Sequence, residues 1–398
     1  MKIGVDVRVL MDEHYSGIAE YTANLLTAIL RQNKALNGAA DDKSDNYRLF
    51  YNSFHNLQGR LAPWDSAQSP LIGTHWPNKI FNYFLQKLCS WPKLDKVLGG
   101  VDIFWSPHFN FTSLSTGAKA PLKISTVHDL SFLRYPEFFS GRKNFWHRAL
   151  GVKKILRAAD KIVAVSENTK NDIIELVGIA PEKIQVIYPG NNLKKEEISP
   201  AAIRELKEKH NLSDNFILYI GNIEPRKNIS GLIEAFNILR AQAASQAENH
   251  LVDLQLVLAG GAGWKNKTIY HAWQKSPYKN DIKFLGYINE AEKAVLYSQA
   301  AIFAYPSFYE GFGFPPLEAM TYGLPVVCSN VSSLPEVVGD AALMINPFRT
   351  EEISKALEII LTDEKVRQRL IDSGYERARL FSWDKAAKEY LELFRKTR

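Results

Sequence analysis

The stretch FILYIGNIEPRKNISGLIEAF (216–236) contains one complete strand–loop–helix unit, and this unit decides the fold. Its first residues are apolar and β-favouring, which indicates a buried strand that ends at Gly221. A loop with Arg226 and Lys227 follows, and a helix is expected to begin near Asn228. A strand that leads directly into a helix is typical of a parallel sheet, because the helix returns the chain to the end where the next strand must start.

The same alternation of strand and helix continues on both sides of this stretch. Apolar runs at 3–7, 47–53, 101–106, 123–129, 161–166 and 183–190 form one series, and runs at 216–222, 254–261, 283–288, 302–307, 325–329 and 341–347 form a second. Each series predicts a doubly wound parallel sheet with helices on both faces. We therefore expect an α/β fold of two Rossmann-like domains, 1–195 and 196–381, that face a central cleft. Ligands of such sheets bind at the carboxyl ends of the strands.

Length and composition agree with a two-domain globular protein. The chain has 398 residues, of which 46% are hydrophobic, and no apolar run approaches the roughly 18 residues of a membrane-spanning helix. The start, MKIGVDVRVL, is read as a first strand and not as a signal peptide. Cys89 and Cys328 are too far apart in the chain to suggest a disulfide framework or a zinc site, so the cytoplasm is the expected compartment.

The positive charge is concentrated in the first half of the chain. Residues 1–195 carry a formal charge of +8 and residues 196–398 a charge of −2. No nucleic-acid motif accompanies this charge, so nucleic acid is not expected as a partner. The segment 75–98 combines aromatic residues with Lys79, Lys87, Lys93 and Lys96. It is either a core-packed helix or a surface that rests on an anionic membrane, which would be the inner face of the plasma membrane.

Two acids flank a glycine- and proline-rich stretch at 310–318. Glu310 precedes Gly311 and Gly313, whose backbone N–H groups could hold a hydroxyl or a phosphate oxygen. A helix is expected to begin near Pro316, because proline suits a first turn and Pro315 disfavours helical angles at Phe314. Glu318 would then lie in the first turn, kept ionised by the helix dipole, where it could accept hydrogen bonds from a ribose diol. The alternative is a capping glutamate and a loop acid without function.

Three further positions are candidates for contact with a ligand. Arg226 and Lys227 could hold a diphosphate at the start of a helix, or they could be a solvated basic loop. Gly17 in HYSGIAEYT could let a phosphate approach the backbone, or belong to an ordinary capped turn. His128 at a strand end could contact a sugar or phosphate, or be structural.

Metal and NAD sites are not expected. The sequence contains no Asp-x-Asp motif and no histidine cluster with ligand spacing, so phosphates must be neutralised by Arg, Lys and helix ends. The glycines at 260, 261 and 263 do not fit the spacing G-x-G-x-x-G. We therefore expect neither a metal nor a cofactor.

With these residues in view, the chain resembles the retaining nucleotide-sugar glycosyltransferases of family 4, which have the GT-B fold. The resemblance covers nearly the whole chain and is strongest in IGNIEPRKN (220–228), FLGYINEAE (284–292) and EGFGFPPLE (310–318). In the first half, SGIAEYT (16–22), VHD (127–129) and AVSENTK (164–170) also match.

The resemblance implies a role for each matching position. Glu310 would contact the hydroxyls of the donor sugar, and Glu318 the ribose. Arg226 and Lys227 would neutralise the diphosphate with help from Gly17. His128 would touch the donor sugar near the reaction centre.

Further implied contacts come from the glycine loop and from a later strand end. Gly311, Phe312 and Gly313 would form the donor-binding loop, and Tyr287 and Ile288 would hold the nucleotide base. The stretch 382–398 would be a helix that crosses back onto the first domain, which is implied to be the acceptor side. Residues 196–381 would bind the donor.

The implied reaction moves a sugar to a saccharide or lipid-linked glycan with retention of configuration, in polysaccharide biosynthesis. The donor would be GDP-mannose, which makes the protein mannosyltransferase-like. The leaving diphosphate would help to deprotonate the incoming hydroxyl, and no protein nucleophile would take part. Two alternatives stay open at this point, which are a sugar-nucleotide epimerase of the same fold and a non-catalytic saccharide-binding protein.

Overall fold

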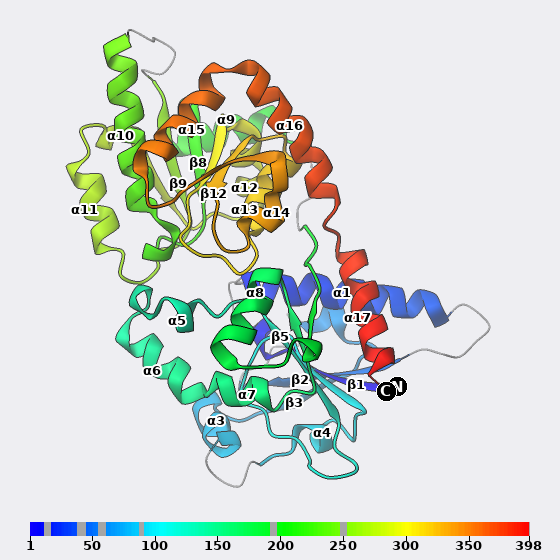
Figure 1. Cartoon of the computed structure of the whole chain (residues 1–398). Helices are drawn as coiled ribbons and strands as arrows, with labels where there is room; N and C mark the ends of the chain where they lie inside the picture. Colours follow the sequence, from blue (N-terminus) through cyan, green and yellow to red (C-terminus); the bar gives the residue numbers. More distant parts are fainter. Residues whose placement is uncertain are drawn as a thin grey trace. The chain divides into compact units, whose positions relative to one another are not determined.

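Two parallel sheets organise the chain, and each belongs to a separate compact unit (Figure 1). The computed structural model describes residues 1–11, 17–37, 45–54, 61–86, 91–191, 197–246 and 253–397. Unit 1 contains Met1–Leu130, Phe145–Gly190 and Ser382–Arg398, and unit 2 contains Ser131–Asn144 and Asn191–Phe381.

Within the described residues, unit 1 has a seven-stranded sheet in the order β3-β2-β1-β4-β5-β6-β7, with neighbouring strands parallel. Its strands are β1 (Lys2–Asp6), β2 (Asn46–Asn52), β3 (Leu71–Thr74), β4 (Ile103–Ser106), β5 (Leu122–Val127), β6 (Lys161–Ala164) and β7 (Ile184–Val186). The helices are α1 (Gly17–Asn37), α3 (Asn78–Gln86), α4 (Leu94–Val97), α7 (Val152–Arg157), α8 (Glu167–Asp172) and α17 (Trp383–Lys396), with α6 (Gly141–Leu150) entering from the Ser131–Asn144 segment.

Unit 2 has a six-stranded parallel sheet in the order β10-β9-β8-β11-β12-β13 within the described residues. Its strands are β8 (Phe216–Ile220), β9 (Gln255–Ala259), β10 (Ile282–Gly286), β11 (Ile302–Tyr305), β12 (Val326–Ser329) and β13 (Ala342–Ile345). The helices are α5 (Ser131–Arg134), α9 (Pro200–His210), α10 (Ile229–Gln246), α11 (Lys267–Lys275), α12 (Glu290–Gln299), α13 (Phe314–Thr321), α14 (Leu334–Val338), α15 (Thr350–Thr362) and α16 (Glu364–Arg379).

Both sheets confirm the predicted doubly wound architecture, and their strand order locates the expected binding edge. The order reverses between β1 and β4 in unit 1 and between β8 and β11 in unit 2. Ligands of such sheets bind where the order reverses, at the carboxyl ends of the strands. In unit 2 this point lies between the loop that carries Arg226 and the loop that carries Glu310.

The last helix of the chain, α17, belongs to unit 1 and packs on α1. Asp384 at its start pairs with Arg31. In the interior, the Tyr390 hydroxyl lies 2.9 Å from that of Tyr21 and 2.7 Å from that of Thr126. These contacts attach residues 382–398 to the first half of the chain, although the sequence separates them by some 250 residues or more.

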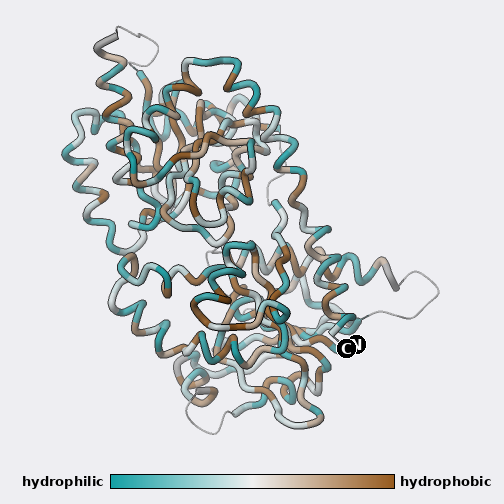
Figure 2. Tube along the Cα trace, in the orientation of Figure 1, coloured by the Kyte–Doolittle hydropathy of each residue, from teal (hydrophilic) through white to brown (hydrophobic). Residues whose placement is uncertain are grey.

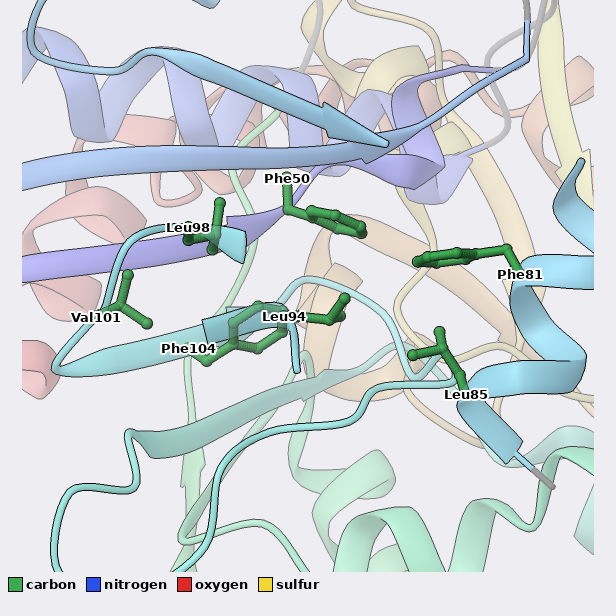
Figure 3. Packing of buried hydrophobic residues seen from close by; sticks show 7 residues of the cluster. All are labelled: Phe50, Phe81, Leu85, Leu94, Leu98, Val101 and Phe104. Atoms are coloured by element: carbon green, nitrogen blue, oxygen red, sulfur yellow. The ribbon is translucent and has the colours of Figure 1, made fainter. Parts of the chain in front are cut away.

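The core of unit 1 contains part of the segment 75–98, for which a core-packed helix and a membrane-facing surface were both considered. Phe81 and Leu85 of α3 are buried in a cluster with five residues of other elements, as Figure 3 shows. That cluster contains Phe50, Phe81, Leu85, Leu94, Leu98, Val101 and Phe104. Ile80 and Tyr83 on the same helix are 47% and 52% exposed, so α3 has one core face and one exposed apolar face. Lys87 lies outside the described residues.

One segment from the first half of the chain is part of unit 2. After β5 the chain forms Ser131–Asn144, where Phe138 stacks on Phe308 with ring centroids 5.6 Å apart. The indole of Trp264 stacks on Phe139 and donates a 2.7 Å hydrogen bond to the Phe138 carbonyl. These aromatic contacts join Ser131–Asn144 to the loop that leads to Glu310.

Hydropathy follows this architecture in both units. Figure 2 shows hydrophobic residues along the sheet strands and many hydrophilic residues on the outer helices. Among the described helices, none is both long and apolar enough to cross a membrane.

Candidate functional site

The loops after β8 and β11 lie side by side at the point where the strand order of unit 2 reverses. The backbone N–H of Phe308 donates to the carbonyl of Arg226 at 2.9 Å. Next to them, the turn after β9 crosses the turn after β8 so closely that a Cβ at Gly260 would overlap the Gly221 carbonyl oxygen. Gly260 also has a φ of +141°, which favours glycine. These glycines therefore allow a close approach of two chain segments.

The predicted helix start near Asn228 is confirmed, and a short turn before it fixes the basic pair. Pro225–Lys227 form a 3₁₀ turn, and Asn228 follows with a left-handed φ of +54° before α10 begins at Ile229. The side-chain amide of Asn228 donates to the Pro347 carbonyl at 2.7 Å. Arg226 and Lys227 at the end of this turn both contact the loop after β11.

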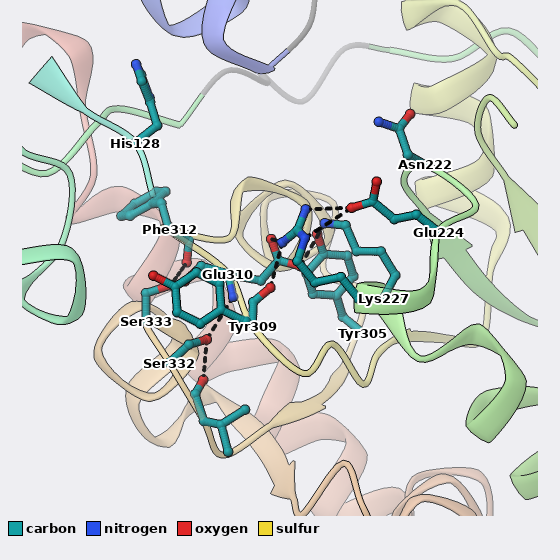
Figure 4. A network of polar contacts seen from close by, with 12 residues as sticks. His128, Asn222, Glu224, Lys227, Tyr305, Tyr309, Glu310, Phe312, Ser332 and Ser333 are labelled. Carbon is teal, nitrogen blue, oxygen red and sulfur yellow. Dashed lines mark hydrogen bonds and ion pairs between the residues drawn. The ribbon is translucent and has the colours of Figure 1, made fainter. Parts of the chain in front are cut away.

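Glu310 is an ionised carboxylate between two cations (Figure 4). Its Oε1 accepts from Lys227 Nζ at 2.7 Å, and its Oε2 accepts from Arg226 Nη1 at 3.1 Å. The residue is only 6% exposed. Burial alone would raise the pKa of Glu310, but the charges of Lys227 and Arg226 lower it to about 2. The carboxylate therefore stays charged at any physiological pH.

Lys227 is held from two sides by hydrogen bonds within unit 2. Its ammonium donates to the Tyr305 hydroxyl at 2.6 Å and to Glu310 at 2.7 Å. An ammonium carries three N–H donors, so the third is not used by these two bonds. Burial lowers the pKa of Lys227, and the charge of Glu310 opposes this shift. The charged form of the lysine thus depends on the carboxylate beside it.

The backbone of the Glu310 loop is tied to the turn before α14. Ser332 Oγ accepts from the Glu310 N–H at 2.9 Å, and Ser333 Oγ lies 3.0 Å from the Glu310 carbonyl and 2.6 Å from that of Phe312. Gly313 has a φ of +114°, and a Cβ there would lie 2.7 Å from Leu334. The loop is therefore tightly packed and hydrogen-bonded to its neighbour.

Phe312 has a buried side chain. It is 5% exposed, and its ring packs against Phe314 and Phe381. The ring therefore anchors the loop, and the role of Phe312 in donor binding stays a prediction.

Glu318 differs from the sequence prediction in two respects. The helix α13 begins at Phe314 with Gly313 as its N-cap, two residues earlier than predicted, so Glu318 lies in the second turn. Proline lacks only an N–H that a first turn leaves unpaired, which lets Pro315 and Pro316 both enter the helix. Burial raises the pKa of Glu318, with Lys293 opposing the shift, whereas the helix-dipole argument implied a favoured charge.

The partners of Glu318 come from α12. Its Oε2 accepts from the Tyr297 hydroxyl at 2.9 Å, and its Oε1 lies 3.5 Å from Lys293 Nζ. Glu310 and Glu318 therefore have different cationic partners within unit 2.

The positions predicted to hold a base follow β10. Gly286 has a left-handed φ of +74°, and the chain then places Tyr287 with 65% of its surface exposed and Ile288 with 9%. Their role in base binding stays a prediction.

His128 and Gly17 belong to unit 1. His128 follows the last residue of β5, as predicted, and its Nε2 lies 2.8 Å from the Pro107 carbonyl. A carbonyl only accepts, so Nε2 carries the ring proton. Burial lowers the pKa of His128 to about 4, so its imidazole is neutral near pH 7. Gly17 is the first residue of α1, and no atom of the described residues would lie within 4 Å of a Cβ added there.

Several residues of the unit 2 network were not predicted. Glu224, buried at 1% exposure, pairs with Arg226, and Tyr305 and the two serines complete the surroundings of Glu310. Glu224 stands two positions before Arg226, which is a usable signal. Tyr305, Ser332 and Ser333 become neighbours only through the order of the strands. In the described residues, no group of three or more His, Cys, Asp or Glu side chains could hold a metal ion.

Comparison with known proteins identifies the class to which this fold and site belong. A family model described as glycosyl transferases group 1 matches residues 202–377, and one described as glycosyltransferase family 4 matches residues 51–195. O-antigen chain mannosyltransferase B of Escherichia coli is 34% identical over 274 residues, which cover 68% of this chain and 70% of that protein. The chain belongs to the group 1 glycosyltransferases of family 4, so it is a sugar-transferring enzyme.

Two further similarities bear on function and on fold. A serotype-specific mannosyltransferase WbdA of Escherichia coli is 31% identical over 303 residues, which cover 73% of this chain and 36% of that protein. The match therefore spans about a third of WbdA. The structure of a sucrose-phosphate synthase from Thermosynechococcus elongatus superposes with a TM-score of 0.72 at 21% identity, over 100% of this chain and 98% of that one. This similarity supports the predicted GT-B fold class.

Proposed function

We propose that the enzyme transfers mannose from GDP-mannose to a hydroxyl group of a saccharide or lipid-linked glycan. The configuration at the anomeric carbon would be retained, and neither a metal nor a cofactor would be needed. The choice of sugar is supported by two relatives that are named mannosyltransferases. Participation in polysaccharide synthesis follows the name of the O-antigen relative.

The observation that carries the proposal is the ionised Glu310 at the reversal point of the unit 2 sheet. Its charge is maintained by two cations, and its backbone is fixed by two serines. A carboxylate held in this way accepts hydrogen bonds from sugar hydroxyls with little reorganisation. The donor sugar is therefore assigned to the space beside Glu310, as the resemblance implied.

The leaving diphosphate needs positive charge and N–H donors. Lys227 has a third proton, and α13 begins directly after the glycine loop that carries Glu310. The N-terminus of a helix and the N–H groups of Gly311 and Gly313 favour anions. As the bond from the anomeric carbon to the diphosphate breaks, the acceptor oxygen bonds to the same face of that carbon, and the diphosphate takes the acceptor proton.

Glu318 is proposed to bind the ribose of the donor, and Tyr287 and Ile288 to hold its base. The neutral His128 imidazole is proposed to contact the donor sugar through hydrogen bonding. Nδ1 accepts if Nε2 keeps its proton for Pro107. Proton transfer from a residue of pKa about 4 is not required, since the diphosphate accepts the proton.

The enzyme is proposed to be cytoplasmic and to touch an anionic membrane through its first domain. The exposed face of α3 with Ile80 and Tyr83 and the charge of +8 over residues 1–195 support this placement. A lipid-linked acceptor would then be reached at the membrane surface.

A thermal-shift panel tests donor class first. GDP-mannose, GDP-glucose, UDP-glucose, GDP and free mannose are compared at equal concentration, each with excess EDTA. GDP-mannose should raise Tm more than the other nucleotide sugars and should do so in EDTA. A larger shift with UDP-glucose would overturn the donor assignment, and a shift that requires magnesium or manganese would overturn metal independence.

A further inference from the structure

Four buried or nearly buried charged side chains form a closed network in unit 2, and they carry two positive and two negative charges. Glu224, Arg226, Lys227 and Glu310 have exposures of 13% or less. These four side chains carry no net charge among themselves, although the sequence suggested two free cations, and Lys143 is a further cation that interacts with Glu224 and Arg226. The geometry of Arg226 shows which cation pairs with protein carboxylates and which remains able to bind a ligand.

Glu224 holds one side of the Arg226 guanidinium. Its Oε1 accepts from Nε at 3.1 Å and from Nη2 at 2.8 Å, so one carboxylate oxygen fixes two N–H groups of the planar fork. The other oxygen, Oε2, is buried and makes no hydrogen bond within the described part of the chain. Burial of an unpaired carboxylate oxygen costs free energy, so this carboxylate is not placed here for stability alone.

Arg226 uses its opposite edge to hold the loop after β11. Nη1 donates to the Tyr309 carbonyl at 2.6 Å and to Glu310 Oε2 at 3.1 Å. Together with the two bonds to Glu224, these contacts engage both sides of the guanidinium with protein acceptors. Four of its five N–H groups thus have protein acceptors, so Arg226 can turn its planar fork onto a phosphate only by leaving two desolvated carboxylates, which is costly.

We propose that Glu224 and Arg226 are positioning residues, in which Glu224 orients Arg226 and Arg226 holds Glu310, while Lys227 alone of the two cations binds the donor diphosphate. This inference rests on the proposed function. It assigns Glu224 a role in the reaction without contact with the substrate, and it changes the expected role of Arg226.

A charge-neutral double variant separates positioning from phosphate binding. Glu224→Gln with Arg226→Gln removes one charge of each sign, so the net charge of the cluster is unchanged. If Arg226 only positions Glu310, the affinity for GDP in calorimetry should stay within about threefold of the wild type. Under the same conditions Lys227→Gln should weaken GDP binding about tenfold or more, because it loses a charge-assisted hydrogen bond. A tenfold loss of GDP affinity in the double variant would overturn the assignment.

The value of kcat tests whether Glu224 acts through Arg226. Glu224→Gln and Arg226→Gln should each lower kcat about ten- to a hundredfold, and the double variant should be no slower than Arg226→Gln within a factor of two. GDP affinity in Glu224→Gln should be unchanged or higher, because a negative charge is removed. Effects on kcat that multiply in the double variant, or a Glu224→Gln enzyme with wild-type kcat, would contradict the proposal.

Two controls separate the proposed effects from a general loss of folding and from the identity of the donor. Glu376→Gln removes a carboxylate of the exposed Arg379 pair in the same unit and should change neither kcat nor GDP affinity. Thermal unfolding is measured for the two single variants and the double variant, and again with Arg226→Lys in place of Arg226→Gln. If the Tm shift of the double variant equals the sum of the two single shifts, the coupling of Glu224 to Arg226 is overturned. A wild-type protein that transfers no sugar would overturn the proposed function, whereas the Tm cycle would still decide the coupling.

Discussion

At the scale of single residues, the two acids that flank the glycine loop have opposite electrostatic surroundings. Glu310 is paired with Lys227 and Arg226, which lower its pKa, whereas burial raises the pKa of Glu318. Glu310 is charged at neutral pH, whereas burial makes the charged form of Glu318 less favourable than usual. Substitution by the neutral isostere glutamine should therefore change the stability of the protein more at Glu310 than at Glu318.

Glu310→Gln should destabilise the protein by about 3–5 kcal/mol at pH 7, because two buried cations lose their counter-charge. The pKa of Glu310 is lowered from 4.5 to about 2, so its contribution to stability is fully present above pH 4.5 and is lost as the pH falls toward 2. Urea unfolding of the wild type and of Glu310→Gln at several pH values measures the difference in their free energies of unfolding. A difference that stays constant from pH 7 down to pH 3 would contradict the assigned pKa.

Glu318→Ala should act on donor binding. If the carboxyl binds ribose in both ground and transition states, its loss raises KM for the donor about tenfold with little change in kcat, whereas Glu310→Ala lowers kcat. Steady-state kinetics with GDP-mannose measure both values. Equal changes of KM and kcat in the two variants would argue against separate roles. Glu318→Gln should lower Tm less than Glu310→Gln does, because burial disfavours the charged form of Glu318.

At the scale of elements, the site depends on how closely three strand ends approach one another. Asn228, Gly260 and Gly313 all have positive φ, and each stands at a turn that brings one loop against its neighbour. The sequence predicted most of these elements, because apolar runs bounded by glycine and proline are a local signal. It missed β3 (Leu71–Thr74), which is a short edge strand with only partly buried residues. It also placed the start of α13 two residues late, since local rules about proline do not show that Gly313 caps the helix.

Adjacent glycines provide a matched test at this scale. Gly260→Ala should destabilise unit 2 by several kcal/mol, about 3 or more, since φ is positive and the new methyl group meets the Gly221 backbone, which cannot move aside. Gly261→Ala should be tolerated, because the nearest atom to its Cβ would be 4.0 Å away. Thermal unfolding of both variants measures the difference. Similar Tm values would contradict the close crossing of the two turns.

At the scale of the whole molecule, the excess positive charge lies in residues 1–195, whereas the charged network around Glu310 lies in unit 2. Unit 2 contains Arg226, Lys227, Glu310 and Glu318, which the sequence identified, and Glu224, which it did not. The arrangement of that network depends on contacts between residues some 80 positions apart, and no sequence pattern specifies such contacts. The segment Ser131–Asn144 was likewise expected in the first domain and belongs to unit 2, where aromatic stacking retains it.

The charge of residues 1–195 leads to a prediction about membranes. The protein should pellet with vesicles that contain anionic lipid, less so as salt is added, because each lysine near such a surface contributes about 1 kcal/mol. Replacing Lys79, Lys87, Lys93 and Lys96 by glutamine should weaken pelleting. If the protein stays in the supernatant at low salt, α3 serves only the core of unit 1 and the acceptor is soluble.

The most direct test of the central claim is the release of GDP from GDP-mannose in the presence of mannose-terminated oligosaccharides and excess EDTA. Wild type and the exposed-pair control Glu376→Ala should release GDP at equal rates, and Glu310→Ala should be slower by about a hundredfold or more. The same rate in Glu310→Ala as in wild type, or release that occurs only after a divalent metal is added, would contradict the account.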